Sequence, residues 1–161
     1  QMTLLKAIKL IKEKISIKAV IMGRGIEKKN LDRYICNNKL KKIVQIIGFK
    51  NNPYNYIKKS ELFILTSIYE GLPNVLLEAQ CLKKFIISTN CPTGPREILL
   101  DGKAGFLFPL KNEQLLAKKI LDYHKRKKKL NKMIVLGYNK LNRFDADINL
   151  KKYYNLINQY L

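Results

Sequence analysis

The chain has 161 residues, of which 47% are hydrophobic and 27% charged, a length and balance typical of one folded domain with a buried core. No apolar run reaches the roughly 18 residues that a membrane-spanning helix needs, and the first residues do not resemble a secretion signal. Cys36, Cys81 and Cys91 are odd in number and lack CxxC spacing, which argues against a disulfide framework or a cysteine metal site. They are expected to be small buried residues in a reducing compartment.

The formal net charge of +20 is the compositional outlier. Such a charge suits a nucleic acid, an anionic membrane surface or an acidic small molecule. A genomic bias toward lysine, isoleucine and asparagine explains it equally well. The lysines are spread along the chain except for one cluster at 125–129, which has no interleaved aromatic residues to stack on nucleic-acid bases. We therefore expect a solvated helix face there and no nucleic-acid partner.

The hydrophobic pattern alternates between helical and strand period over the first 110 residues. In chain order it predicts a helix at 3–14 with Thr3 as N-cap, a strand at 17–22, a helix at 27–38, a strand at 43–47, a helix at 53–60, a strand at 62–66, a helix at 73–83, a strand at 85–89, a short helix at 94–100 and a strand at 105–108. The strands are continuous apolar runs, which indicates a parallel sheet covered on both faces. The expected fold is an α/β, Rossmann-like, doubly wound parallel sheet.

After Leu110 the pattern is helical to the end of the chain, with additional C-terminal helices expected at 112–123, 126–142 and 146–161. His124, the only histidine, lies among lysines and is expected to be solvated, not a general base. Three tyrosines at helical spacing are expected to pack the last helix against the domain: Tyr153, Tyr154 and Tyr160. At the other end, Gln1 to Leu5 already follow a helical pattern, so we expect the chain to be cut from a longer one.

In an open α/β sheet, ligands bind at the carboxyl ends of the strands. The loops at those ends are 23–25, 48–52, 67–72 and 90–94. Arg24 lies between two glycines in the first of them and could contact a base or a phosphate; a solvated loop arginine is the alternative. Arg96 and Glu97 open a helix at the last of them, where ligand contact competes with capping or an ion pair.

The loop at 67–72 is the most informative, because Glu70 lies in it and Glu78 lies two turns into the helix that follows. A helix end attracts phosphate through its unpaired N–H groups and its dipole. Carboxylates only accept hydrogen bonds, so they suit sugar hydroxyls. A nucleotide diphospho-sugar would satisfy both kinds of group, with the phosphates at the amides of Asn74, Val75 and Leu76. The alternative is a solvated Glu78 and a Glu70 that merely ends a turn.

The segment from Glu70 to Glu78, with seven residues between its glutamates, resembles the donor-site signature of retaining GT-B glycosyltransferases of family four. The similarity extends to three further segments, 19–25 (AVIMGRG), 46–49 (IIGF) and 91–99 (CPTGPREIL) with Gly102 and Gly105. It runs in order from Gln1 to about Tyr123. The chain would then be the C-terminal, donor-binding half of a GT-B fold.

The resemblance implies roles for particular residues. Glu70 would be the catalytic candidate that binds the donor sugar, and Glu78 would bind the ribose hydroxyls. Lys50 would meet the nucleotide base through its backbone, and Gly23 and Arg24 would contribute the glycine loop. The backbone of one stretch would hold sugar and diphosphate: Gly71, Leu72, Pro73, Asn74, Val75 and Leu76. No metal and no cofactor are expected, since basic groups and the helix end stabilise the leaving diphosphate.

The chain also departs from the family pattern. The arginine and lysine that grip the diphosphate would lie on a strand and turn before Gln1, and the N-terminal acceptor domain is missing. We therefore expect residues 1–161 to form a truncated nucleotide-sugar-binding domain that binds weakly and catalyses nothing alone.

The expected function is transfer of a hexose or N-acetylhexosamine, with retention of configuration, to a cell-surface glycan or lipid-linked acceptor. The donor is expected to be a UDP-sugar, and the location the cytoplasm, with an anionic membrane surface on its inner face as a candidate partner. Two alternatives stay open: an inactive paralogue that serves as a partner or scaffold, and a basic nucleic-acid-binding module.

Overall fold

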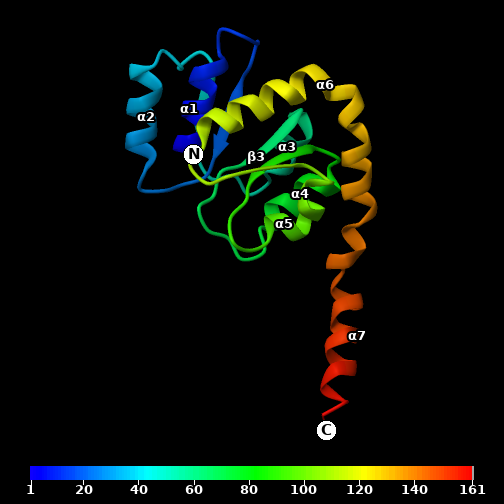
Figure 1. Cartoon of the computed structure of the whole chain (residues 1–161). Helices are drawn as coiled ribbons and strands as arrows, with labels where there is room; N and C mark the ends of the chain where they lie inside the picture. Colours follow the sequence, from blue (N-terminus) through cyan, green and yellow to red (C-terminus); the bar gives the residue numbers. More distant parts are fainter. Residues whose placement is uncertain (161) are drawn as a thin grey trace.

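The structure is a computed structural model and describes residues 1–160. Five parallel strands form its centre (Figure 1): β1 (Ala19–Met22) pairs with β2 (Val44–Ile47), and β3 (Leu62–Leu65), β4 (Phe85–Thr89) and β5 (Phe106–Phe108) pair in that order. The helices are α1 (Met2–Ile11), α2 (Lys28–Asn37), α3 (Tyr54–Lys59), α4 (Asn74–Cys81), α5 (Pro95–Ile98), η1 (Leu100–Gly102), α6 (Glu113–Asn139), η2 (Leu141–Phe144) and α7 (Ala146–Ile157). The expected parallel α/β fold is confirmed.

The middle strand of the three-stranded sheet, β4, has all five of its residues buried. Because strand side chains alternate between faces, Phe85 and Ile87 join the core formed with α1 and α6. Ile86 joins the core on the other face, with residues of α4 and α5. Phe85 also stacks on Tyr123 of α6, with ring centroids 4.9 Å apart. Coverage of both faces explains why this strand is an unbroken apolar run.

The first helix, α1, joins the two sheets. Its Ala7 and Ile11 lie in the core shared with α6 and the three-stranded sheet. Its Leu5 and Ile8 lie in a second core with α2, β1 and β2. The helix begins at Met2 with Gln1 as N-cap, so the expected cap at Thr3 is wrong.

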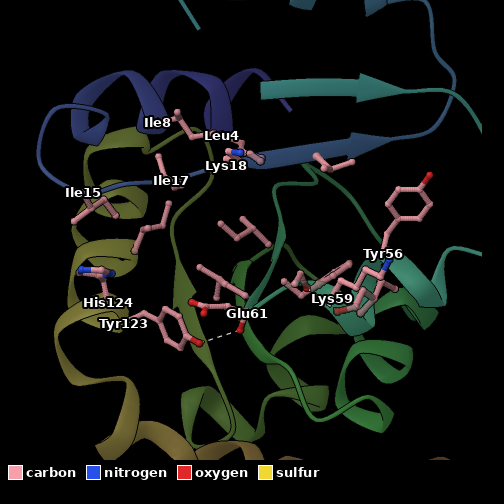
Figure 2. A pocket seen from close by; sticks show the side chains of 18 of the residues that line it. Leu4, Ile8, Ile15, Ile17, Lys18, Tyr56, Lys59, Glu61, Tyr123 and His124 are labelled. Carbon is pink, nitrogen blue, oxygen red and sulfur yellow. Dashed lines mark hydrogen bonds between the residues drawn. The ribbon is translucent and has the colours of Figure 1, made fainter. Parts of the chain in front are cut away.

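A groove of about 690 Å³ separates β1 from β3, which are not hydrogen-bonded to each other. It divides the expected single sheet into one of two strands and one of three. Figure 2 shows side chains around this space, including Leu4 of α1, Tyr123 of α6 and Glu61, which directly precedes β3. Val20 on β1 is 48% exposed, although its sequence pattern is that of a buried strand.

The last part of the domain differs from the expectation of two helices at 112–123 and 126–142. Both are one continuous helix, α6, which crosses the domain and then turns along its side (Figure 1). The cluster at 125–129 does not break it, because lysine and arginine are good helix formers. Within α6, no glycine or proline occurs before Gly137. His124 is exposed on this helix, as expected.

The final helix, α7, projects away from the domain (Figure 1) and contributes no buried residue. Tyr153, Tyr154 and Tyr160 are 67%, 67% and 84% exposed, so the expectation that they pack against the domain is wrong. The helix ends at Ile157, and Leu161, the end of the expected helix, lies outside the described residues. No helix among residues 1–160 is long and apolar enough to span a bilayer.

The expectation of three buried cysteines holds only for Cys91. Cys36 on α2 and Cys81 on α4 are exposed, because each lies on the outward face of an amphipathic helix.

Candidate functional site

A cavity of about 930 Å³ lies at the carboxyl ends of β1, β2 and β3. The start of α1, the loops after these strands and the first turns of α4 form its wall. Four of the residues singled out from the sequence line it: Gly23, Lys50, Val75 and Glu78. They come together because parallel strands end at one edge of a sheet and the loops that follow them meet there.

Each of these residues owes its place to local structure. Gly23 follows β1 with φ +129, a conformation that side chains rarely adopt, and its N–H donates to Ile47 O at 3.2 Å. Lys50 follows Phe49 after β2, and both are exposed. Glu78 is half-buried on α4, one turn beyond Val75, so both reach the cavity from one helix face.

The amino-terminal end of α4 faces the same region. Pro73 is its N-cap and is buried, and it has no N–H to offer a ligand. The Leu76 N–H donates to Pro73 O at 2.9 Å, and its side chain is fully buried in the core. The expected free amide of Leu76 is therefore not available. Asn74 and Val75 occupy the first helical positions, whose N–H groups have no intrahelical acceptor.

The loop between β3 and α4 reaches the cavity with Ser67, Ile68 and Tyr69. Glu70 follows and is half-buried, but it is not among the residues that line the cavity. Its carboxylate lies near Cys91: burial raises the pKa of the Cys91 thiol, and the negative charge of Glu70 raises it further. Gly71 and Leu72 are exposed beside it.

Charged residues that sequence reasoning missed also line the cavity. Lys6 of α1, Lys111 and the expected Lys50 bring three positive charges to it. Glu27 and Glu113 bring negative ones, and Glu113 lies 3.9 Å from Lys6. No strand-end signal identifies Lys6, because its approach to the cavity depends on how α1 packs. Lys111 lies in the loop after β5, a strand end that is not among the loops singled out from the sequence. Phe49 and Ser67 also line the cavity, and both lie in the strand-end loops 48–52 and 67–72 expected from the sequence.

Two arginines considered from the sequence lie apart from the cavity. Arg24 is exposed on the loop after Gly23. Arg96 forms an ion pair with Asp101, with Nε and Nη2 each 3.0 Å from Oδ1. In addition, no three His, Cys, Asp or Glu side chains of residues 1–160 gather as a metal site would require.

Residues 1–140 match the family model of glycosyl transferases group 1. The chain belongs to this family. Every element described so far except η2 and α7 lies within the matched residues, so the glycosyltransferase assignment covers both the parallel sheets and the cavity.

Individual relatives agree with the family. The chain is 40% identical over 100 residues to an uncharacterized glycosyltransferase of Methanocaldococcus jannaschii, a match that covers 62% of this chain and 25% of the relative. It is 37% identical over 100 residues to a Campylobacter jejuni N-acetylgalactosamine-N,N'-diacetylbacillosaminyl-diphospho-undecaprenol 4-alpha-N-acetylgalactosaminyltransferase, covering 62% of this chain and 27% of that one. The chain thus spans about a quarter of the length of these relatives.

Solved glycosyltransferase structures share the fold. Staphylococcus aureus TarM, in complex with Fondaparinux, alpha-GlcNAc-glycerol and UDP, superposes with a TM-score of 0.88 at 24% identity, over 98% of this chain and 32% of TarM. Anabaena HepE in complex with UDP superposes with a TM-score of 0.85 at 20% identity, over 100% of this chain and 45% of HepE. The C-terminal domain of LpcC from Francisella tularensis gives 0.75 at 24% identity, over 89% and 77%. This chain therefore has the fold of one Rossmann-like domain of a GT-B glycosyltransferase.

Proposed function

We propose that this domain binds a nucleotide diphospho-sugar, in particular a UDP-sugar, and supplies the donor side of a retaining glycosyltransferase. The transferred group is a hexose or N-acetylhexosamine, and the acceptor is a cell-surface glycan or a lipid-linked glycan. The observation that carries the proposal is the cavity that brings together Glu78, the amino-terminal end of α4 and three lysines. Hydroxyl acceptors, amide donors and positive charge are the groups that a ribose and a diphosphate require.

The relatives' names are in keeping with this donor and acceptor. One relative is an N-acetylgalactosaminyltransferase acting on a diphospho-undecaprenol-linked sugar. Another is a poly(ribitol-phosphate) alpha-N-acetylglucosaminyltransferase of Staphylococcus aureus, 28% identical over 112 residues that cover 70% of this chain and 23% of that protein. TarM and HepE have both been crystallised with UDP bound.

Each group has a defined part in the proposed reaction. The bond between the sugar's anomeric carbon and the diphosphate oxygen breaks, and a bond from that carbon to an acceptor oxygen forms. The proton of the acceptor hydroxyl passes to the departing diphosphate. Negative charge grows on the departing diphosphate, where Lys6, Lys50, Lys111 and the end of α4 stabilise it electrostatically. Glu70 binds the donor sugar and Glu78 the ribose. No step uses a metal, so EDTA should leave donor binding unchanged.

The test of these roles compares Glu78→Gln with Glu70→Gln by calorimetry on this chain. A hydrogen bond to a charged acceptor contributes roughly 1.5–3 kcal/mol, so Glu78→Gln should weaken UDP binding by about ten-fold or more. Glu70→Gln should leave UDP affinity nearly unchanged, because it faces the sugar, but should lower turnover in a complete transferase.

The matched control is Glu13→Gln, which changes the charge equally on an exposed side chain outside the cavity. It should bind UDP as the parent does. The ribose role of Glu78 is wrong if Glu78→Gln binds UDP as tightly as Glu13→Gln.

We also propose that the acceptor side lies in a separate N-terminal domain and that residues 1–161 do not transfer sugar alone. The relatives are about four times as long as the matched part of this chain, which is the support for this division. The groove between β1 and β3 is a second observation in favour of a longer protein. Both β1 and β3 are edge strands that border the groove, so a further strand from the longer protein could pair with them there.

A further inference from the structure

The loop that carries Glu70 has few anchors among its own side chains. Ile68, Tyr69 and Leu72 are 60%, 78% and 48% exposed. A Cβ placed on Gly71 would meet nothing within 4 Å. Exposed side chains contribute little burial to hold a loop in one conformation. Contacts to its backbone must therefore hold this loop.

Those contacts come from the segment that follows β4. Thr89, the last residue of that buried strand, donates from Oγ1 to Ser67 O at 2.6 Å at the beginning of the loop. Thr93 donates from Oγ1 to Glu70 O in its middle. Each threonine satisfies a main-chain carbonyl, so neither bond depends on which side chains the loop bears.

Gly94 completes the contact. Its φ is +86, and a Cβ on it would lie 2.4 Å from Gly71 O and 2.3 Å from Cδ of Pro73. The loop backbone thus packs against a residue that can only be glycine. The buried Cys91 also contacts the segment after β4, because its Sγ lies 3.8 Å from Thr93 O.

We propose that Thr93 is a positioning residue for sugar recognition: its hydroxyl holds the Glu70 backbone so that the Glu70 carboxylate meets the donor sugar. This inference rests on the proposed function of the cavity. Glu78 is held independently, because it lies on α4, whose Leu76 and Ala79 are fully buried. Loss of the Thr93 hydroxyl should therefore affect binding of the donor's sugar and should not affect binding of its nucleotide.

The test uses two variants of the parent chain. Thr93→Val removes the hydroxyl but keeps the branched shape, and Thr93→Ser keeps the hydroxyl but removes the methyl group. Amide ¹⁵N relaxation in this chain should show that Glu70 and Gly71 become mobile in Thr93→Val, with order parameters falling from about 0.85 toward 0.6. The amides of Leu77 and Ala79 on α4 should stay as rigid as in the parent. Thr93→Ser should restore the loop.

Binding is measured on the same variants with UDP, UDP-glucose and UDP-N-acetylglucosamine. Thr93→Val should bind UDP within two-fold of the parent, while the additional affinity for the preferred nucleotide sugar falls by about five-fold, the effect of one hydrogen bond. Equal loss for UDP and nucleotide sugar, or a loop that stays rigid in Thr93→Val, would overturn the positioning role. A parent that binds none of the three ligands would overturn the proposed function, and the relaxation data would still decide whether Thr93 orders the loop.

Discussion

At the scale of single residues, Tyr123 joins the long helix α6 to the start of β3. Its ring stacks on Phe85, and its Oη donates to Glu61 O at 2.9 Å. The Glu61 carboxylate accepts from Lys127 at 2.7 Å, one turn further along α6. That pair lowers the pKa of Glu61, but both side chains are more than half exposed, so the buried Tyr123 is the stronger link.

Tyr123→Phe keeps the ring and removes the hydroxyl. We expect it to lower the free energy of unfolding by about 1 kcal/mol at pH 7, the usual net value of one hydrogen bond. Burial raises the pKa of Tyr123 above its ordinary value of about 10. The neutral Tyr123 hydroxyl therefore makes its full contribution to the free energy of unfolding below pH ~10. That contribution is lost as the pH rises through the raised pKa.

Urea unfolding of the parent and the variant between pH 7 and 11 checks both statements. The stability difference should be constant up to about pH 10 and should shrink above it, because only the parent can ionise at this position. A difference that grows above pH 10 would contradict the assignment.

The candidate site could be predicted from the sequence where a residue directly follows a strand or opens a helix. Gly23 directly follows β1 and reaches the cavity for that reason, whereas the places of Lys50 and Glu78 are implied by the resemblance of their segments to the donor site of family four. The contribution of Lys6 could not be predicted, because it depends on how α1 packs against strands far along the chain. Lys111 lies in the loop after β5 and could have been found from its place at a strand end. The occupied amide of Leu76 is a bond to its N-cap, a detail of the first helical turn that residue spacing does not determine.

At the scale of elements, the order and type of the strands follow from their continuous apolar runs, and all five lie within the predicted ranges. The expected interruption between 123 and 126 is absent from α6, and the charged residues there have long aliphatic stems and extend helices well. The exposure of α7 could not be predicted, because an amphipathic pattern shows which face is apolar without showing what covers it. The division of the sheet into two could not be predicted either, because it depends on which strands pair across long stretches of the chain.

That division gives a prediction about β1. Ala19 and Gly23 donate their N–H groups to Ile43 O and Ile47 O, so alternation points the N–H groups of Val20 and Met22 toward the groove. We expect hydrogen exchange by NMR to show low protection factors at Val20 and Met22 and high ones at Ala19 and Gly23. In a longer protein with a strand in the groove, the two low values should rise. Equal protection at all four positions in this chain would show that the β1 edge is already paired.

At the scale of the whole molecule, the chain has 32 lysines and arginines but only 12 aspartates and glutamates, so acidic side chains can pair with only a minority of the basic ones. Within the cluster at 125–129, Arg126 pairs with Asp122 at 2.9 Å and Lys127 pairs with Glu61 at 2.7 Å. Lys125, Lys128 and Lys129 are exposed on the same helix. We propose that these three clustered lysines contact the anionic membrane surface considered from the sequence as a partner.

We expect the chain to bind vesicles containing anionic lipid more tightly than neutral phosphatidylcholine vesicles, with strong weakening by salt. Replacing Lys125, Lys128 and Lys129 together by glutamine should reduce binding, since each cation near such a surface contributes roughly 1 kcal/mol. A matched control replaces Lys14, Lys41 and Lys42, which are exposed and lie outside the cluster. Sedimentation with vesicles measures both. Equal binding to neutral and anionic vesicles would show that the charge is compositional bias alone.

The backbone anchoring of the loop before α4 has a consequence for how such enzymes diversify. Since Thr89 and Thr93 hold carbonyl oxygens, selection can exchange the exposed side chains at Ile68, Tyr69 and Leu72 without dismantling the loop that displays them. In the proposed donor site, the residues that keep the loop folded and the residues that select the sugar would then be different positions. A combinatorial library at those three residues should consist largely of folded variants, which makes this short segment a natural starting point for redirecting the enzyme to new donors.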